Sequence, residues 1–266
     1  MTTIRQPAVA DMFYPADPNT LQTMIDGFLA DANVEGPVPK ALIVPHAGYI
    51  YSGPVAASAY HLLEPARQKI KRVVLLGPAH RVPVLGLAAT SADYFATPLG
   101  NIPIDREAVD QALQLAQVRE VDPAHAMEHS LEVHLPFLQT VLADFKLVPF
   151  VVGDANPQEV AEVLDLLWGG DETLIVISSD LSHYQSYDKA RVLDQATSEN
   201  IEKLRPEAIR HSDACGRNPI NGLLALARQK GLTAKTIDLR NSGDTAGPHD
   251  EVVGYGAYIF VEPTRH

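Results

Sequence analysis

The sequence predicts one α/β domain over residues 1–266, with a mainly parallel central sheet and flanking helices. Short runs rich in valine, isoleucine and leucine alternate with helical patterns, which is the order expected for parallel strands joined by helical crossovers. Three of these runs lead into a histidine motif. Because ligands of parallel sheets gather outside the carboxyl ends of the strands, we expect one site assembled from distant parts of the chain.

The expected elements follow from hydrophobic runs and capping residues. The first strand, 41–46, leads into a helix that Ser52 would cap, with Pro54 in its first turn and its end near Leu63. Next come a strand over 72–77, irregular chain to about 104, a helix from Asp105 to about Val118, a helix over 128–143, a strand over 146–152 and a helix over 157–168. The last are a strand over 173–179, a polar helix over 187–204, a helix from Asn218 ended by Gly231, an irregular turn over 241–247, and strands over 234–240 and 252–261.

Composition narrows the classes of function. With 266 residues and 46% hydrophobic side chains, the chain can bury a large core. Its net charge of -12 disfavours nucleic-acid binding and fits a small neutral or cationic substrate or another protein. No apolar stretch approaches the roughly 20 residues that cross a bilayer, and the N-terminus lacks a secretion signal pattern, so we expect a soluble, cytoplasmic protein. The single cysteine excludes an intrachain disulfide and agrees with a reducing compartment.

Three histidines, His46, His80 and His183, follow the predicted buried strands. A histidine just past such a strand is fixed at its backbone while its ring faces the crevice, which suits a preformed metal site. One such residue alone is more simply a core or capping histidine. Three of them at strand ends favour a single site that contains at least two.

Cys215, the only cysteine, lies immediately before the helix that Asn218-Pro219 would start. Unpaired backbone N–H groups and the helix dipole there favour the thiolate, which binds metals or attacks carbon. A free cysteine is also among the most commonly buried residues and can serve as a small hydrophobe. Spacing alone leaves both interpretations open.

The segment Glu128-His129-Ser130-Leu131-Glu132-Val133-His134 superficially matches a zinc-protease helix. In that motif the histidines are four residues apart, whereas His129 and His134 are five apart and would diverge by about 140° on a helix. They should therefore not share a metal. Glu128 and Glu132 would share a helix face, so one of them could reach the site, but solvated surface carboxylates are the simpler interpretation.

Asp180 and His183 place a carboxylate beside an imidazole, a pair suited to orienting or protonating a substrate. A serine hydrolase is disfavoured because the chain has no Gly-x-Ser-x-Gly elbow. Nucleophilic catalysis by Cys215 with His183 and Asp180 stays open as an alternative. Neither a dinucleotide-binding nor a P-loop glycine pattern is present.

Several motifs in order make the chain resemble a known family. They are Arg5-Gln6-Pro7-Ala8-Val9-Ala10 with Phe13-Tyr14-Pro15, Pro45-His46-Ala47-Gly48-Tyr49, Gly77-Pro78-Ala79-His80, Glu128-His129-Ser130-Leu131-Glu132, Ser178-Ser179-Asp180 with His183, and Cys215-Gly216-Arg217 with Pro219-Ile220. The chain resembles the Memo family, whose prokaryotic members are called AmmeMemoRadiSam system protein B. The resemblance implies one domain similar to class III extradiol ring-cleaving dioxygenases, which hold non-haem Fe(II) with two histidines and a glutamate.

The resemblance also implies roles for particular residues. The positions that match the family's metal ligands are His46, His80 and Cys215. Asp180 and His183 match residues lining the site, with His183 corresponding to the acid/base histidine of the dioxygenases. Residues of the same motifs that we expect to contact substrate are Tyr49, Glu128 and His129.

A cysteine in place of the dioxygenases' glutamate alters the expected metal. Thiolate is a softer donor than carboxylate, so the set favours Cu(I) or Zn(II) while still allowing Fe(II). The resemblance implies an Fe- or Cu-dependent oxidoreductase acting on a small molecule. The alternatives are a non-catalytic protein that handles metal or binds a peptide in the same pocket, and metal-free hydrolysis by cysteine and histidine. The relatives' names suggest a functional link to a radical SAM protein.

Overall fold

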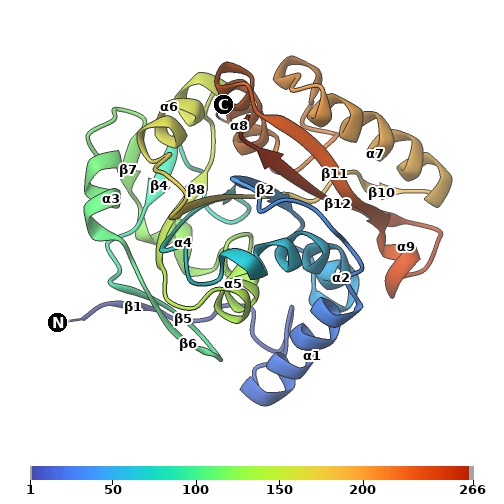
Figure 1. Ribbon diagram of the computed structural model, residues 1–266, viewed down its shortest axis with the longest axis horizontal. Coiled ribbons are helices and arrows are strands. Elements are labelled where there is room, and N and C mark those ends of the chain that lie inside the picture. Colours follow the sequence, from blue (N-terminus) through green and yellow to red (C-terminus); the bar gives the residue numbers. More distant parts are fainter. Residues whose placement is uncertain (1, 264–266) are drawn as a thin grey trace.

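The computed structural model describes residues 2–263, and its central feature is a nine-stranded mixed sheet (Figure 1). The strands of this sheet are β2 (Ala41–Val44), β3 (Arg72–Pro78), β4 (Leu87–Ala89), β7 (Val118–Glu120), β8 (Lys146–Val152), β9 (Thr173–Ser178), β10 (His183–Gln185), β11 (Thr233–Asn241) and β12 (Val252–Val261). Their order is β10-β12-β2-β9-β3-β8-β4-β7, with β11 paired to β12.

The four central strands, β2, β9, β3 and β8, are all parallel. Nearly every residue in them is buried, as expected for β-branched runs that helices cover on both faces. Antiparallel pairs flank them, because β12 pairs with β2, β10 and β11, and β4 pairs with β8. The predicted α/β fold with a mainly parallel sheet is confirmed, and the antiparallel flanks add to it.

Helices cover both faces of this sheet (Figure 1). Helices α1, α2 and α5 pack together on one face, and α6, α7 and α8 lie over the other. Their bounds are α1 Pro18–Asp31, α2 Tyr49–Tyr60, α5 Leu135–Val141, α6 Pro157–Leu166, α7 Tyr187–Glu202 and α8 Arg217–Lys230, and shorter helices are α3 Arg106–Ala112, α4 Asp122–Ala126 and α9 Ser242–Thr245. Within the described chain, no helix is long and apolar enough to cross a membrane.

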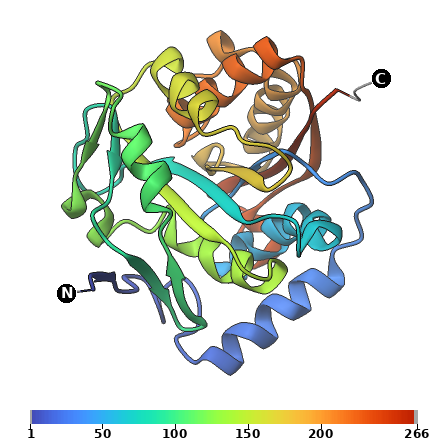
Figure 2. The ribbon, with the colours of Figure 1, turned by 60° about the vertical axis from the view of Figure 1, so that its left-hand side comes forward.

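A second, three-stranded sheet takes two of its strands from the stretch where the sequence predicts irregular chain. It joins β1 (Ile4–Arg5), β5 (Tyr94–Thr97) and β6 (Gly100–Pro103). Figure 2 shows the β5–β6 hairpin reaching down beside the N-terminal segment. These strands are short and only partly apolar, so their hydrophobic pattern is too weak to predict them.

The start of α2 differs from the prediction. The helix begins at Tyr49 after Gly48, so Ser52 is inside it rather than at its cap. The Ser52 hydroxyl donates to the carbonyl of Ala47 at 3.0 Å. Regular α-helix ends at Tyr60 and continues as a 3₁₀ turn over 61–66.

The helix predicted over 128–143 is wrong for its first four residues. Residues 128–129 are irregular and 130–131 form a turn, followed by a 3₁₀ turn at Glu132–His134 and then α5. The carboxylate of Glu128 accepts the backbone N–H groups of His129 and Ser130, each at 3.0 Å. Such local side-chain bonds compete with helical hydrogen bonding, which explains the difference.

Two predicted helix ends are confirmed in place. Asp105 caps α3 by accepting the Ala108 N–H at 3.3 Å, although α3 ends at Ala112 instead of near Val118. Gly231 ends α8 in the left-handed conformation, with φ at 71°. The irregular turn predicted over 241–247 is wrong, because this stretch contains the short helix α9, which Asn241 caps by accepting the Gly243 N–H.

Candidate metal centre

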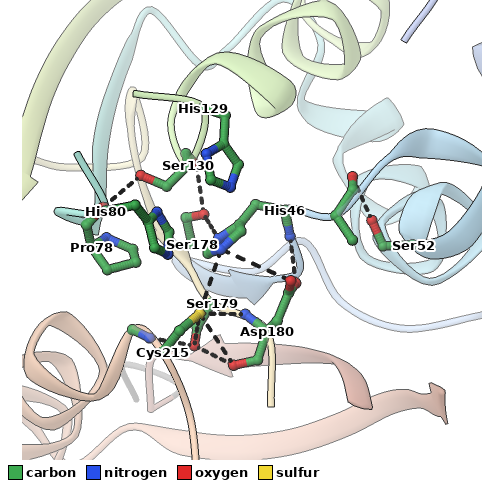
Figure 3. A network of polar contacts seen from close by, with 12 residues as sticks. His46, Ser52, Pro78, His80, His129, Ser130, Ser178, Ser179, Asp180 and Cys215 are labelled. Carbon is green, nitrogen blue, oxygen red and sulfur yellow. Dashed lines mark hydrogen bonds and ion pairs between the residues drawn. The ribbon is translucent and has the colours of Figure 1, made fainter. Parts of the chain in front are cut away.

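The predicted ligands meet where the central parallel strands end (Figure 3). His46 follows β2 and His80 follows β3, while Cys215 lies just before α8. Donor atoms of these three side chains lie within 4.8 Å of one another. The structure therefore brings together His46 and His80, two of the histidines that the strand-end pattern predicts to share a site, and Cys215, which the family resemblance adds as a ligand.

His46 is only 2% exposed, and partners surround its ring. Its Nδ1 lies 2.6 Å from Ser178 Oγ and its Nε2 lies 3.4 Å from Cys215 Sγ. Burial, and then the neighbouring histidines, hold the pKa of His46 well below 6.5. The ring is therefore neutral at physiological pH, which is the form that binds metals.

His80 is oriented by the carboxylate of Glu128. Glu128 accepts the His80 backbone N–H at 2.6 Å and lies 2.8 Å from His80 Nδ1. Burial acts to raise the pKa of Glu128, but the hydrogen bonds and charge of His80 outweigh it and lower the pKa to about 2. A carboxylate only accepts, so Nδ1 of His80 carries the hydrogen and Nε2 is left free to bind a metal. A carboxylate is a common hydrogen-bond partner for the other nitrogen of a metal-binding histidine.

Cys215 is a thiol in the metal-free protein. Burial, followed by the charge of Asp180, raises its pKa to about 12, which corrects the expectation that the following helix favours the thiolate. Its sulfur accepts the Asp180 N–H at 3.3 Å. Metal binding would release the thiol proton, since the thiolate is the ligand form.

Gly216 explains how Cys215 reaches the ends of the strands. A Cβ at position 216 would lie 2.5 Å from the carbonyl oxygen of Ser178 and 2.6 Å from Cβ of Ser179. Only a residue without a side chain fits that close approach. The glycine therefore lets the loop before α8 press Cys215 against the end of β9.

Asp180 and His183 both lie near the cluster but do not form a hydrogen-bonded pair. Asp180 Oδ1 accepts the His46 backbone N–H at 2.8 Å, and burial raises the pKa of Asp180 to about 6. His183 Nδ1 lies 2.8 Å from the Leu181 carbonyl. The carbonyl of Leu181, and not Asp180, thus fixes the His183 tautomer and leaves its Nε2 as the acceptor.

His129 lies against the predicted ligands. Its ring stacks on His80 with centroids 4.7 Å apart and meets His46 edge-on at 5.4 Å. Phe13, from the N-terminal segment, packs against it at 4.7 Å. The position of His129 is compatible with the predicted contact to substrate.

Two other residues expected to contact substrate are used elsewhere. The Glu128 carboxylate accepts N–H groups of His80, His129 and Ser130, three at Oε1 and one at Oε2, so Glu128 orients His80. Tyr49 is 2% exposed and donates to the carbonyl of Val133 at 2.6 Å. It is a core residue and leaves no surface for a ligand.

The expectation that Glu128 and Glu132 are solvated is also wrong, because they are 2% and 1% exposed. Glu132 accepts from the guanidinium of Arg5, from the Tyr14 hydroxyl at 2.5 Å and from the N–H of Ala8 and Val9. This buried carboxylate therefore ties the N-terminal segment to the segment that orients His80.

Sequence reasoning missed Ser178 and His134 as parts of the site. Ser178 Oγ lies 2.8 Å from His134 Nε2 as well as 2.6 Å from His46 Nδ1. Ser178 ends a buried strand in the motif Ser178-Ser179-Asp180, and that polar position was a signal of its role. His134 points away from the ligand cluster, with its Nε2 at Ser178 and its Nδ1 at Tyr60.

Comparisons with known proteins agree with the motifs. Residues 5–259 match the family model described as Memo-like protein. Relatives named MEMO1 family protein include one from Ignicoccus hospitalis, 36% identical over 98% of this chain and 99% of its own length. Another, from Aquifex aeolicus, is 37% identical over 97% of this chain and 99% of its own length.

The fold also has a counterpart among solved structures. The crystal structure of uncharacterized protein JW3007 from Escherichia coli K12 superposes with a TM-score of 0.51 at 13% identity, covering 82% of this chain and 98% of that one. At that identity the likeness concerns the fold alone. The match over nearly the whole chain and the full-length relatives establish that the protein belongs to the Memo family.

Proposed function

We propose that this protein is a metal-dependent oxidoreductase that acts on a small substrate, with His46, His80 and Cys215 as the ligands of Fe(II) or a copper ion. The main support is the convergence of three donor atoms within 4.8 Å from three separate segments at the carboxyl ends of parallel strands. A redox-active ion there would supply electron transfer and open coordination positions for O2 and a substrate.

The chemistry of the donors fits such an ion. Ser178 and Glu128 occupy the Nδ1 atoms of the two imidazoles, which leaves both Nε2 atoms as the free donors. Two imidazoles and one thiolate suit Cu(I) and Zn(II) especially well and remain compatible with Fe(II). Among these, copper and iron support a redox reaction, whereas zinc would not.

The residues around the ligands can handle protons. His183 donates through Nδ1 to the Leu181 carbonyl, so its Nε2 can take a proton from a bound substrate and return it. Asp180, with its pKa raised to about 6 by burial, can hold a proton close to His46. His80 has a side chain that is 28% exposed, which gives solvent and small molecules a way to the cluster.

Metal handling without turnover is the second candidate. The sulfur donor and the 2% exposure of His46 are the observations that favour it, because a buried soft ligand set suits sequestration of Cu(I). Metal-free hydrolysis by cysteine is disfavoured. The histidine that contacts Cys215 is His46 rather than His183. A nucleophilic cysteine also needs a lowered pKa, whereas burial raises the pKa of Cys215.

The test is anaerobic titration of metal-free protein with Fe(II), Cu(I) and Zn(II). We expect one ion per chain in the wild-type protein and loss of that binding in His46→Ala and Cys215→Ser. His211→Ala, which removes an exposed histidine four residues before Cys215 that offers no donor atom to the ligand cluster, is the matched control. Unchanged binding in both ligand variants would contradict the assignment of the site.

Turnover separates the two candidates. We expect the Fe- or Cu-loaded protein to consume O2 when a catechol is added, and His183→Ala to lose this activity while it still binds metal. Tight Cu(I) binding without any O2 uptake, across a panel of phenolic and other reduced substrates, would favour metal handling.

A further inference from the structure

The hydroxyl of Ser178 lies at the centre of a buried hydrogen-bond network behind His46. Its Oγ is 2.6 Å from His46 Nδ1, 2.8 Å from His134 Nε2 and 2.6 Å from the carbonyl oxygen of Ser130. Ser178 is completely buried, so the hydrogen bonds of its hydroxyl are made with these three neighbours. A hydroxyl has one hydrogen to donate and two lone pairs that accept.

Only one arrangement of hydrogens satisfies all three contacts. The Ser130 carbonyl cannot donate, so the single hydrogen of Ser178 must point to it. Both lone pairs of Ser178 Oγ then accept, and each imidazole must donate. His46 therefore carries its hydrogen on Nδ1, and His134 carries a hydrogen on Nε2.

The other side of His134 agrees with this arrangement. Its Nδ1 lies 2.8 Å from the hydroxyl of Tyr60, which donates to it if the ring is neutral. Burial lowers the pKa of His134 to about 3, so the ring is neutral. Tyr60 is completely buried, so the network ends inside the protein. A network that does not reach solvent fixes hydrogens in place and does not carry protons to the site.

The arrangement decides which nitrogen of His46 faces the ligand cluster. With the hydrogen on Nδ1, the Nε2 lone pair points at Cys215 Sγ, 3.4 Å away, where the thiol of the metal-free protein can donate to it. The opposite tautomer would direct the Nδ1 lone pair at the lone pairs of Ser178 and an Nε2 hydrogen into the metal position. It would thus both lose a hydrogen bond and block the site.

We propose that Ser178 and His134 are positioning residues, which hold His46 as its Nδ1–H tautomer and so present Nε2 to the metal. The inference rests on the proposed function for the identity of the ligand site. It adds a second task for the segment 128–134, whose Glu128 orients His80 while its Ser130 and His134 orient His46 through Ser178.

The first test needs no metal. Long-range ¹H–¹⁵N correlation spectra of the metal-free protein at neutral pH report which imidazole nitrogen carries hydrogen, and comparison with His46→Ala and His134→Gln assigns the two rings. We expect His46 to be protonated at Nδ1 and His134 at Nε2. A His46 ring protonated at Nε2 would overturn the inference.

The second test measures Zn(II) and Cu(I) affinity by competition with a chelator. Loss of the outer partner of a metal-binding histidine costs about 10–100-fold in affinity, so we expect that loss in Ser178→Ala, together with a mixture of His46 tautomers. Ser178→Thr keeps the hydroxyl and should retain the Nδ1–H tautomer and most of the affinity. Ser58→Ala removes another buried serine hydroxyl outside the ligand cluster and is the control.

The outcomes separate the two proposals. Affinity within twofold of wild type in a folded Ser178→Ala protein, with His46 still protonated at Nδ1, would overturn the positioning role. Failure of the wild-type protein to bind either ion would contradict the proposed function, and the tautomer in the metal-free spectrum would still support or overturn the inference about Ser178.

Discussion

The two histidine ligands are held in different ways. His46 is almost completely buried and its Nδ1 meets a neutral serine, whereas His80 has a 28% exposed side chain and its Nδ1 meets a buried carboxylate. A neutral serine fixes a tautomer without adding charge, while a carboxylate also places a negative charge near a bound cation. Both arrangements depend on the segment 128–134, so the centre has one shared support for two unlike ligands.

The largest expected effect comes from weakening that shared support. Arg5→Met would leave the buried carboxylate of Glu132 without its guanidinium and would also remove a donor to the Glu128 carbonyl. Removing one partner of a buried ion pair costs about 3–5 kcal/mol, so we expect that loss in the free energy of unfolding, measured in urea. Arg228→Met, which removes an exposed partner of Glu207, should cost less than about 1 kcal/mol. Equal losses in the two variants would show that the Arg5 contact contributes little.

The role of the carboxylate that holds His80 can be tested by Glu128→Gln. Glutamine offers one accepting oxygen in place of two, so at least one of the N–H groups of His80, His129 and Ser130 loses its partner. We expect about 10–100-fold weaker metal binding, in the range expected for Ser178→Ala. Because a charge is lost only in Glu128→Gln, its affinity should also become less sensitive to salt. Glu199→Gln on the exposed face of α7 is the control for the loss of a carboxylate.

The strand ends explain how much of this site the sequence could predict. His46, His80 and Asp180 follow β-branched runs whose burial on both faces marks them as central strands, and parallel strands bring such residues to one edge. The position of Cys215 depends instead on the packing of Gly216 against the end of β9, a tertiary contact that hydrophobic pattern does not encode. The family motifs, and not the spacing, identified that residue.

The segment 128–134, in contrast, has a structure that the sequence pattern did not predict. Its apolar spacing suggests a helix, but the Glu128 carboxylate binds the next N–H groups and turns the chain. That turn lets Glu128 reach His80 while His134 reaches Ser178. Polar pairings between distant residues cannot be predicted from one-dimensional periodicity. The hydrogen bond from Tyr49 to the Val133 carbonyl, within the core, is another such pairing.

His134, which supports His46 through Ser178, and Glu128, which supports His80, should contribute to stability over different pH ranges. The pKa of His134 falls from 6.5 to about 3 on folding, so the unfolded chain binds a proton below pH 6.5 that the folded protein does not. Its contribution to stability is complete above pH 6.5 and is lost as the pH falls toward 3. The pKa of Glu128 falls from 4.5 to about 2, so its contribution is complete above pH 4.5 and is lost as the pH falls toward 2.

Unfolding free energies between pH 7 and 3 would check this difference. From pH 6.5 to 5 we expect His134 to account for about 2 kcal/mol of the loss, from 1.36 kcal/mol per pH unit. His134→Gln should flatten the curve above pH 5, whereas Glu128→Gln should flatten it only below pH 4.5. A His134→Gln curve parallel to that of wild type between pH 7 and 5 would contradict the assignment of a neutral, buried ring.

The smallest expected effect comes from removing a hydrogen bond to Val133, which lies in the segment 128–134 that supports both histidine ligands. Tyr49→Phe removes the hydroxyl that donates to the Val133 carbonyl and keeps the ring that packs against Tyr14 and Phe137. A net hydrogen bond is worth about 1 kcal/mol, so we expect a loss of that size in unfolding free energy. Metal affinity should stay within twofold of wild type, because the hydroxyl touches neither Glu128 nor Ser178. A large drop in affinity for metal or substrate with unchanged stability would instead place Tyr49 in the site, as the family motif led us to expect.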